Sequence, residues 1–160
     1  MKGFVKLSAY QTSHLQLQTD LKGLPEVLSW FEKLHQPPIN KQIWVQCQLA
    51  LAEAFTNVVR HAHKQQSAEI PIDIEVRISD RCVEIRVWDY GEYFDLQEKL
   101  NEMPKKEEND SHGGRGLQLM ESIADRLSYT RTEDNRNCLL MVKYYDRDKG
   151  FSQRDTVNFN

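Results

Sequence analysis

Apolar residues recur along this chain at two different periods, and the period predicts the type of each element. Between residues 21 and 35 they lie three or four positions apart, which predicts an amphipathic helix that ends at Gln36-Pro37-Pro38. A second, long helix is expected from about residue 41 to about residue 63, with Asn40 as its N-cap. A third, short helix is expected over residues 115–126.

Strict alternation of apolar and polar residues predicts the strands. A short strand around Leu15 and Leu17 comes first. Residues 70–78 alternate next and turn at Ser79-Asp80-Arg81 into a return strand, and residues 127–132 and 138–145 form a second hairpin. This order of elements predicts an α+β fold, a two-layer α/β sandwich in which helices cover one face of a mixed, mainly antiparallel sheet.

The domain is expected to span residues 1–145, followed by a polar tail at 146–160. Residues 96–113 form a polar, charged connection between the two halves of the sheet. A loop of this length inside a small domain is usually functional, typically a lid, or else disordered. We therefore expect a lid here, with disorder as the alternative.

Composition places the chain among soluble single-domain proteins, with 160 residues, 39% hydrophobic residues and 28% charged residues. A net charge of −3, with basic residues scattered along the chain, argues against direct binding to nucleic acid. We expect no membrane association, since the chain contains no run of 18 apolar residues and no signal peptide. Three cysteines without a C-x-x-C spacing indicate buried structural thiols in the reducing cytoplasm.

A polar stripe on the long helix is the first candidate for chemistry. Glu53, Asn57 and His61 lie at i, i+4 and i+8, so they occupy one narrow face of the helix. The Asn57 carbonyl oxygen suits Mg²⁺, and the Glu53 carboxylate could orient or deprotonate a nucleophile. A solvated helix face would show the same pattern.

A charged residue on the core face of a strand is the second candidate. Asp89 continues the apolar alternation of the strand before it, so its carboxylate should point into the core. Gly91 follows and would allow something planar to approach closely. Such a carboxylate can accept a hydrogen bond from an amino group like that of adenine, although Asp89 could also merely cap a turn.

A glycine-rich start to the third helix is the last candidate. In Gly113-Gly114-Arg115-Gly116-Leu117, backbone N–H groups and the helix N-terminus could bind an anion, and Arg115 could add charge. A flexible hinge could have the same composition. Together, the three segments supply a cation site, an amino-group acceptor and a phosphate site, which are the parts of an ATP-Mg²⁺ pocket.

These segments resemble the sequence boxes of the ATPase superfamily shared by gyrase, histidine kinases and a heat-shock chaperone, whose fold is the Bergerat type. The similarity runs from about residue 15 to about residue 145. The segments Glu53-Ala54-Phe55-Thr56-Asn57, Asp89-Tyr90-Gly91 and Gly114-Arg115-Gly116-Leu117 are most similar to the small anti-sigma factor serine/threonine kinases. Tyr93 stands where many superfamily members carry a second glycine, and the Phe94-Asp95 pair after it resembles the anti-sigma branch.

The resemblance implies a role for each matching position. Asn57 would hold Mg²⁺, Glu53 would be the catalytic base, and Asp89 and Gly91 would form the adenine site. The triphosphate would lie along Gly114 and Gly116, with His61, Arg115 and Leu117 as further nucleotide contacts. The partners implied are an anti-sigma antagonist protein, which is phosphorylated, and a sigma factor, which is sequestered, with a homodimer also expected.

Three other functions stay open or are disfavoured. A non-catalytic module could use ATP only to change its affinity for a partner. Metal binding by His61 and His63 is disfavoured, because side chains two residues apart on a helix point in different directions. A complete histidine kinase is disfavoured, since no dimerising helical hairpin with a substrate histidine precedes the domain.

Overall fold

Five strands form one sheet in the computed structural model, which describes residues 11–103 and 115–146. In chain order they are β1 (Gln11–Gln18), β2 (Pro71–Ile78), β3 (Cys82–Asp89), β4 (Arg126–Arg131) and β5 (Asn137–Tyr144). Their order in space is β1-β2-β3-β5-β4, and all four pairings are antiparallel. The expected mixed sheet is therefore antiparallel throughout the described strands, because the long connections reverse the chain as the two hairpins do.

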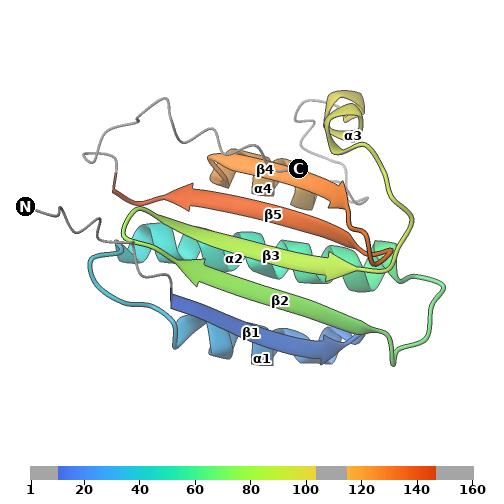
Figure 1. The fold of residues 1–160 in the computed structure, drawn as a ribbon, viewed down its shortest axis with the longest axis horizontal. Helices are drawn as coiled ribbons and strands as arrows, with labels where there is room; N and C mark the ends of the chain where they lie inside the picture. The colour runs from blue at the N-terminus through green and yellow to red at the C-terminus, as the bar shows by residue number, and fades with distance from the viewer. Residues whose placement is uncertain (1–10, 104–114, 147–160) are drawn as a thin grey trace, which may run out of the picture.

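The helices lie on one face of this sheet, as expected for a two-layer sandwich (Figure 1). Behind the strands are α1 (Leu24–Glu32), α2 (Lys41–Asn57) and α4 (Arg115–Ile123), whereas α3 (Leu96–Glu102) lies outside the sheet, past its edge strand β4. A short 3₁₀ turn, η1 (Leu21–Gly23), precedes α1, and a π-helical turn, η2 (Val58–Ala62), follows α2. Within the described ranges, no helix is long and apolar enough to cross a membrane.

Apolar side chains from both layers meet in one core. Val83, Ile85 and Val87 alternate along β3 toward the helices and are at most 2% exposed. On α2, the Asn40 side chain accepts a hydrogen bond from the Gln42 N–H at 2.7 Å, which caps the helix as expected. Burying each large aliphatic side chain contributes about 1.5–3 kcal/mol, so the alternation determines which sheet face α2 covers.

One part of the expected polar connection is a helix, so the prediction of an irregular loop from residue 96 onward is wrong. The Asp95 side chain accepts a hydrogen bond from the Glu98 N–H at 2.9 Å and so caps the start of α3. Leu96 is buried, and Leu100 and Met103 pack against the core. The charged residues between Leu96, Leu100 and Met103 obscured the helical spacing of these three apolar residues in the sequence. Residues 104–114, the rest of the expected lid, lie outside the described part.

The long helix changes its winding before the expected end near residue 63. The His63 N–H donates a hydrogen bond to the Val58 carbonyl, five residues earlier, at 2.8 Å. This is the bond of a π-turn, and such turns often occur at functional sites. The last strand ends at Tyr144, close to the expected domain boundary at 145, and residues 147–160 of the expected tail are not described.

Candidate functional site

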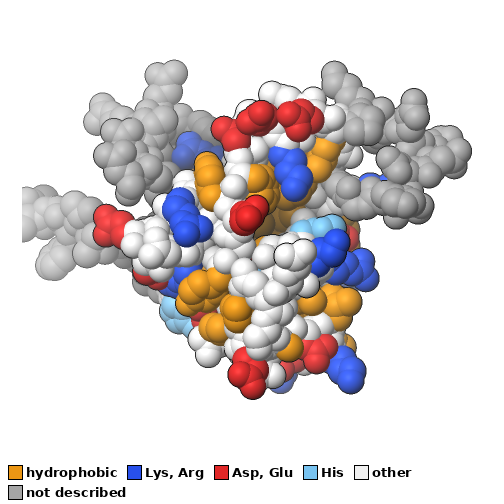
Figure 2. All heavy atoms as spheres, turned by 90° about the vertical axis from the view of Figure 1, so that its right-hand side faces the viewer, with side chains coloured by type: hydrophobic (Ala, Val, Ile, Leu, Met, Phe, Trp, Pro, Cys, Tyr) orange, Lys and Arg blue, Asp and Glu red, His pale blue; other side chains and the backbone are white. Residues whose placement is uncertain are grey.

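A pocket of about 840 Å³ opens where β3 ends, between the sheet, the end of α2 and the start of α4. Figure 2 looks onto this end of the molecule and shows hydrophobic side chains in a hollow whose rim carries charged residues. Its volume falls in the range typical of small-molecule sites. The residues around it include Asn57, His61, Asp89, Tyr93, Phe94, Leu117, Met120, Tyr129 and Leu139.

Asp89 is buried on the core face of β3, as its position in the alternation predicts, and is 3% exposed. Its Oδ1 accepts hydrogen bonds from the Gly91 N–H at 2.8 Å and from Asn137 Nδ2 at 2.9 Å. Its Oδ2 accepts a hydrogen bond from the Tyr129 hydroxyl at 2.8 Å. These three donors compensate for the burial of a carboxylate and hold it in one orientation at the pocket wall.

Two of these donors, Asn137 and Tyr129, were not among the residues expected from the sequence. Asn137 is fully buried, and its Nδ2 also donates to the Gly91 carbonyl oxygen at 2.8 Å. It precedes the apolar alternation of β5 just as Asp89 follows that of β3, and the two residues pair across the sheet. That polar residue on a core face is the signal that could have identified it.

The Tyr129 hydroxyl keeps its proton in this environment. Burial, followed by the neighbouring Asp89 charge, raises the pKa of Tyr129 above its ordinary value. The side chain therefore stays protonated at neutral pH and donates its hydrogen bond to Asp89.

Gly91 packs directly against the π-turn. A Cβ placed on Gly91 would lie 2.7 Å from the Ala62 carbonyl oxygen and 2.8 Å from the Ala62 Cβ. No larger residue fits without moving one of the two backbones. Gly91 therefore allows a close approach of the protein's own backbone, and it is not among the residues that line the pocket, so its role in the adenine site stays a prediction.

The polar stripe of the long helix lies at the other side of the pocket. Asn57 and His61 border the cavity, and Glu53 lies one helical turn before Asn57. Glu53 and Asn57 are half-buried, whereas His61 is exposed. The stripe is thus not the fully solvated helix face that was the alternative interpretation.

The start of α4 rests on this stripe. A Cβ placed on Gly116 would lie 2.7 Å from Glu53 Oε2 and 3.3 Å from both polar atoms of the Asn57 amide. Leu117, the next residue, is buried and lines the pocket. Arg115 is exposed at the first position of the helix, and Gly114 lies outside the described residues.

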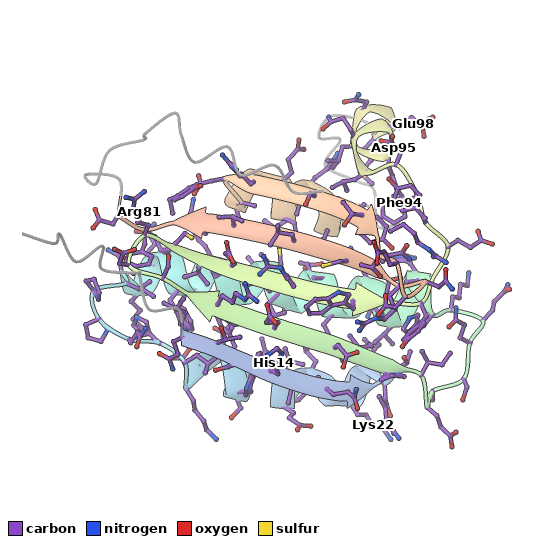
Figure 3. The ribbon with its side chains drawn as sticks, viewed as in Figure 1. His14, Lys22, Arg81, Phe94, Asp95 and Glu98 are labelled. Carbon is purple, nitrogen blue, oxygen red and sulfur yellow. The ribbon has the colours of Figure 1, made fainter. Side chains whose placement is uncertain are left out.

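Two lysines add positive charge to the pocket wall, Lys64 after the π-turn and Lys99 on α3. The Lys99 ammonium nitrogen lies 4.4 Å from the centre of the Phe94 ring. In Figure 3, Phe94 lies between the end of the sheet and the start of α3, where Asp95 caps the helix. The Phe94-Asp95 pair therefore positions α3 above the pocket.

His63 is a structural residue rather than a metal ligand. It is 2% exposed, its Nε2 accepts a hydrogen bond from the Tyr90 N–H at 2.9 Å, and its Nδ1 lies 2.8 Å from the Thr19 hydroxyl. Because both ring nitrogens of His63 already take part in hydrogen bonds, neither is free to bind a metal ion together with His61. The described ranges contain no cluster of three or more His, Cys, Asp or Glu residues that could hold a metal ion.

Known proteins share this sequence pattern and fold. The model of the histidine kinase-like ATPase domain family matches residues 17–143. Serine-protein kinase RsbW of Bacillus licheniformis is 32% identical over 106 residues, and that of Staphylococcus epidermidis is 30% identical over 106 residues. Each match covers 63% of this chain and 65% of the relative, so the chain spans less than two thirds of the relatives' length.

A solved structure shows the same fold. The RsbU and RsbW domains of a Mycobacterium tuberculosis protein superimpose with a TM-score of 0.58 at 13% identity, covering 83% of this chain and 32% of that chain. These similarities agree with the resemblance to small serine kinases, and an ATPase family implies the use of ATP. The match over residues 17–143 decides the family: this chain belongs to the histidine kinase-like ATPase domain family.

Proposed function

We propose that this protein is an ATP- and Mg²⁺-dependent serine/threonine kinase that phosphorylates a small antagonist protein and sequesters a sigma factor. One observation carries the proposal: Glu53 and Asn57 of α2, Gly116 and Leu117 of α4, and Asp89 of β3 lie around the same end of the molecule. The similarity to serine-protein kinases RsbW supports the reaction class.

Asp89 is the acceptor for the nucleobase in this proposal. Its carboxylate borders the pocket, and three hydrogen bonds hold it in place. An oxygen that bears a full negative charge accepts hydrogen bonds from an amino group such as the 6-amino group of adenine. Asp89 is therefore assigned to that amino group in this proposal.

Asn57 provides the oxygen ligand for Mg²⁺. Its amide borders the pocket next to Gly116, close to the helix start at which phosphates would bind. The possible metal ligands in this region are the oxygen atoms of the Asn57 amide and the Glu53 carboxylate, and oxygen ligands suit a hard cation such as Mg²⁺. When bound, Mg²⁺ supplies charge neutralisation for the triphosphate. The resemblance assigns Gly114, Gly116 and Leu117 to the phosphates, with Arg115 and His61 as further contacts of the nucleotide.

Glu53 is the catalytic base. Its Oε2 faces the start of α4, the segment assigned to the phosphates. The oxygen of a substrate serine attacks the γ-phosphorus of ATP, the bond to the ADP oxygen breaks, and Glu53 takes up the serine hydroxyl proton. Most of the rate gain in such transfers comes from positioning and electrostatics, so the base must lie close to the phosphates.

The partners follow from the similarity rather than from a described surface. The proposed substrate is a small antagonist protein with a target serine or threonine, and the proposed bound partner is a sigma factor, with the kinase acting as a homodimer. Three buried free thiols fit the reducing cytoplasm as the place of action.

Phosphotransfer from γ-labelled ATP tests the proposal. The native cytoplasm is passed over the immobilised protein with ATP or ADP, and captured proteins are incubated with labelled ATP and mapped for phosphorylated residues. We expect label on one serine or threonine of a small captured protein. Tight ATP binding without transfer to any captured protein would instead indicate a non-catalytic module that ATP switches.

Glu53→Gln separates binding from chemistry. The amide keeps the size of the side chain next to Gly116 but cannot take up a proton, so we expect unchanged ATP affinity and a loss of transfer of about 100-fold or more. Glu26→Gln, an exposed position on α1, is the matched control and should retain full activity. A fully active Glu53→Gln variant would remove Glu53 from the mechanism.

A further inference from the structure

We propose that Tyr93 is a base-stacking residue, and that Tyr129 holds its ring at a set position relative to Asp89. The proposal rests on the nucleotide pocket described above and adds a recognition element for the nucleobase. It concerns the position at which many members of the superfamily carry glycine. The ligand class is a purine nucleotide, recognised through the flat face of its base.

Tyr93 lines the pocket and is half exposed. Its side chain is 50% exposed, the largest exposed fraction among the large hydrophobic side chains of the described residues. Its ring is parallel to that of Tyr129, with 5.8 Å between the ring centres and 3° between the planes. An aromatic ring at the edge of a pocket, held parallel to a buried one, offers a surface on which a base can stack.

Tyr129 joins this surface to the hydrogen-bond acceptor. Its ring is stacked with those of both Tyr93 and Phe94, and the distance between the centres of the Tyr129 and Phe94 rings is 4.5 Å. Its hydroxyl donates to Asp89 Oδ2 at 2.8 Å. One rigid side chain therefore sets the separation between the aromatic surface and the carboxylate. A planar ligand that binds Asp89 by its edge is then brought against the aromatic side chains by its face.

Tyr90 provides an internal comparison. It lies three residues earlier in the same loop and is 42% exposed, but it is absent from the pocket lining and its ring lies near His63, at 6.4 Å between centres. Exposure alone therefore does not distinguish the two tyrosines. Of these two tyrosines, only Tyr93 combines exposure with a position at the pocket and a parallel aromatic neighbour.

Calorimetric titration of the full chain with ATP is the first test. Stacking on an aromatic side chain contributes enough that Tyr93→Ala should weaken ATP binding about 5- to 150-fold. Tyr93→Phe should bind within about twofold of the unmodified protein, because the ring is retained, and so should the matched control Tyr90→Ala. Tyr129→Phe keeps the ring contact but loses the hydroxyl, and should weaken ATP binding about 2- to 20-fold.

Fluorescence gives a second readout that does not depend on affinity. A base stacked on an indole quenches it, so the emission added by Tyr93→Trp should fall when ATP saturates the protein. The emission added by Tyr90→Trp should not change.

Several results would overturn the inference. Tyr93→Ala with unchanged affinity, Tyr93→Phe as weak as Tyr93→Ala, or equal quenching of the two tryptophan variants would each exclude a stacking role. Tyr129→Phe with unchanged affinity would exclude the coupling to Asp89. If the unmodified protein itself fails to bind ATP, the proposed function fails; if it binds and Tyr93→Ala binds equally well, only the stacking inference fails.

Discussion

Asp89 illustrates how one residue can be costly for the fold and useful for the site. A carboxylate at 3% exposure is tolerated because Gly91, Asn137 and Tyr129 all donate hydrogen bonds to it. These donors approach from the protein side, so the carboxylate is oriented before any ligand binds. Preorganisation of this kind lowers the cost of binding.

Asp89→Asn should weaken ATP binding by about 1–3 kcal/mol. The amide introduces two N–H donors where the amino group of adenine needs an acceptor, and it also faces three donors of the protein. Calorimetry at a temperature at which circular dichroism shows a folded variant measures the effect. Asp20→Asn is the control, because asparagine also caps the turn at that position. Unchanged ATP affinity in Asp89→Asn would refute the assignment.

His63 should make stability depend on pH. Burial lowers the pKa of His63 from 6.5, and the nearby Asp89 charge opposes this only in part. The folded protein needs the neutral ring, because His63 Nε2 accepts a hydrogen bond from the Tyr90 N–H and must therefore be unprotonated. The single ring proton is then on Nδ1, which donates a hydrogen bond to the Thr19 hydroxyl oxygen. The unfolded chain therefore takes up a proton at His63 at a higher pH than the folded protein does. The free energy of unfolding should be fully retained above about pH 6.5 and should fall as pH drops from there toward the lowered pKa.

Urea unfolding between pH 5 and pH 8 measures this dependence. In His63→Gln the part of the slope below about pH 6.5 should be reduced, whereas His61→Gln, at an exposed position, should keep the slope of the unmodified protein. Identical slopes in all three proteins would contradict the role given to the buried ring.

At the scale of elements, the pocket depends on close contact between the loop after β3 and the π-turn after α2. Gly91→Ala should destabilise the protein by about 1–3 kcal/mol, since the new methyl group would lie 2.7 Å from the Ala62 carbonyl oxygen. Gly23→Ala is the matched control: its methyl group would lie 3.1 Å from the flexible Leu17 Cδ2, and the change should be below about 1 kcal/mol. Equal unfolding free energies for the two variants would show that the contact is not tight.

The sequence predicts those elements whose period is clean. Alternation places β2 and β3 and the turn at residues 79–81 correctly, and helical spacing places α1 and α4 to within a few residues. It also gives the start of α2 correctly, although α2 ends at Asn57 and not near residue 63. The capped helix α3 was missed, because charged residues separate Leu96 from Leu100 and only contact with the core reveals their shared face. A change from α- to π-helical winding has no recognisable period, so η2 was also missed.

The site was predictable in part for the same reason. Asp89, Asn57 and Leu117, each singled out by a recognisable local pattern, lie at one pocket, and the roles assigned to them stay predictions. Tyr129 was missed because its link to Asp89 depends on strand order: β5 lies between β3 and β4, and no local pattern specifies that order. The residues that join separate elements are those that sequence patterns alone reveal least.

At the scale of the whole molecule, the sandwich buries all three cysteines. Burial raises the pKa of the Cys47 thiol to about 12 and that of the Cys138 thiol to about 11, and it also raises the pKa of Cys82. In the native protein at pH 8, all three thiols should therefore react with a disulfide reagent orders of magnitude more slowly than a free thiol. In denaturant, three thiols should react at once. A thiol that reacts rapidly in the native protein would contradict this description of the core.

The central claim is that segments distant in sequence surround one purine nucleotide. A crystal structure with Mg²⁺ and a non-hydrolysable ATP analogue tests it most directly. The account predicts the adenine amino group at Asp89, the metal at the Asn57 amide oxygen and the phosphates at the start of α4. An analogue bound in another cavity, or bound here with its base away from Asp89, would contradict the account.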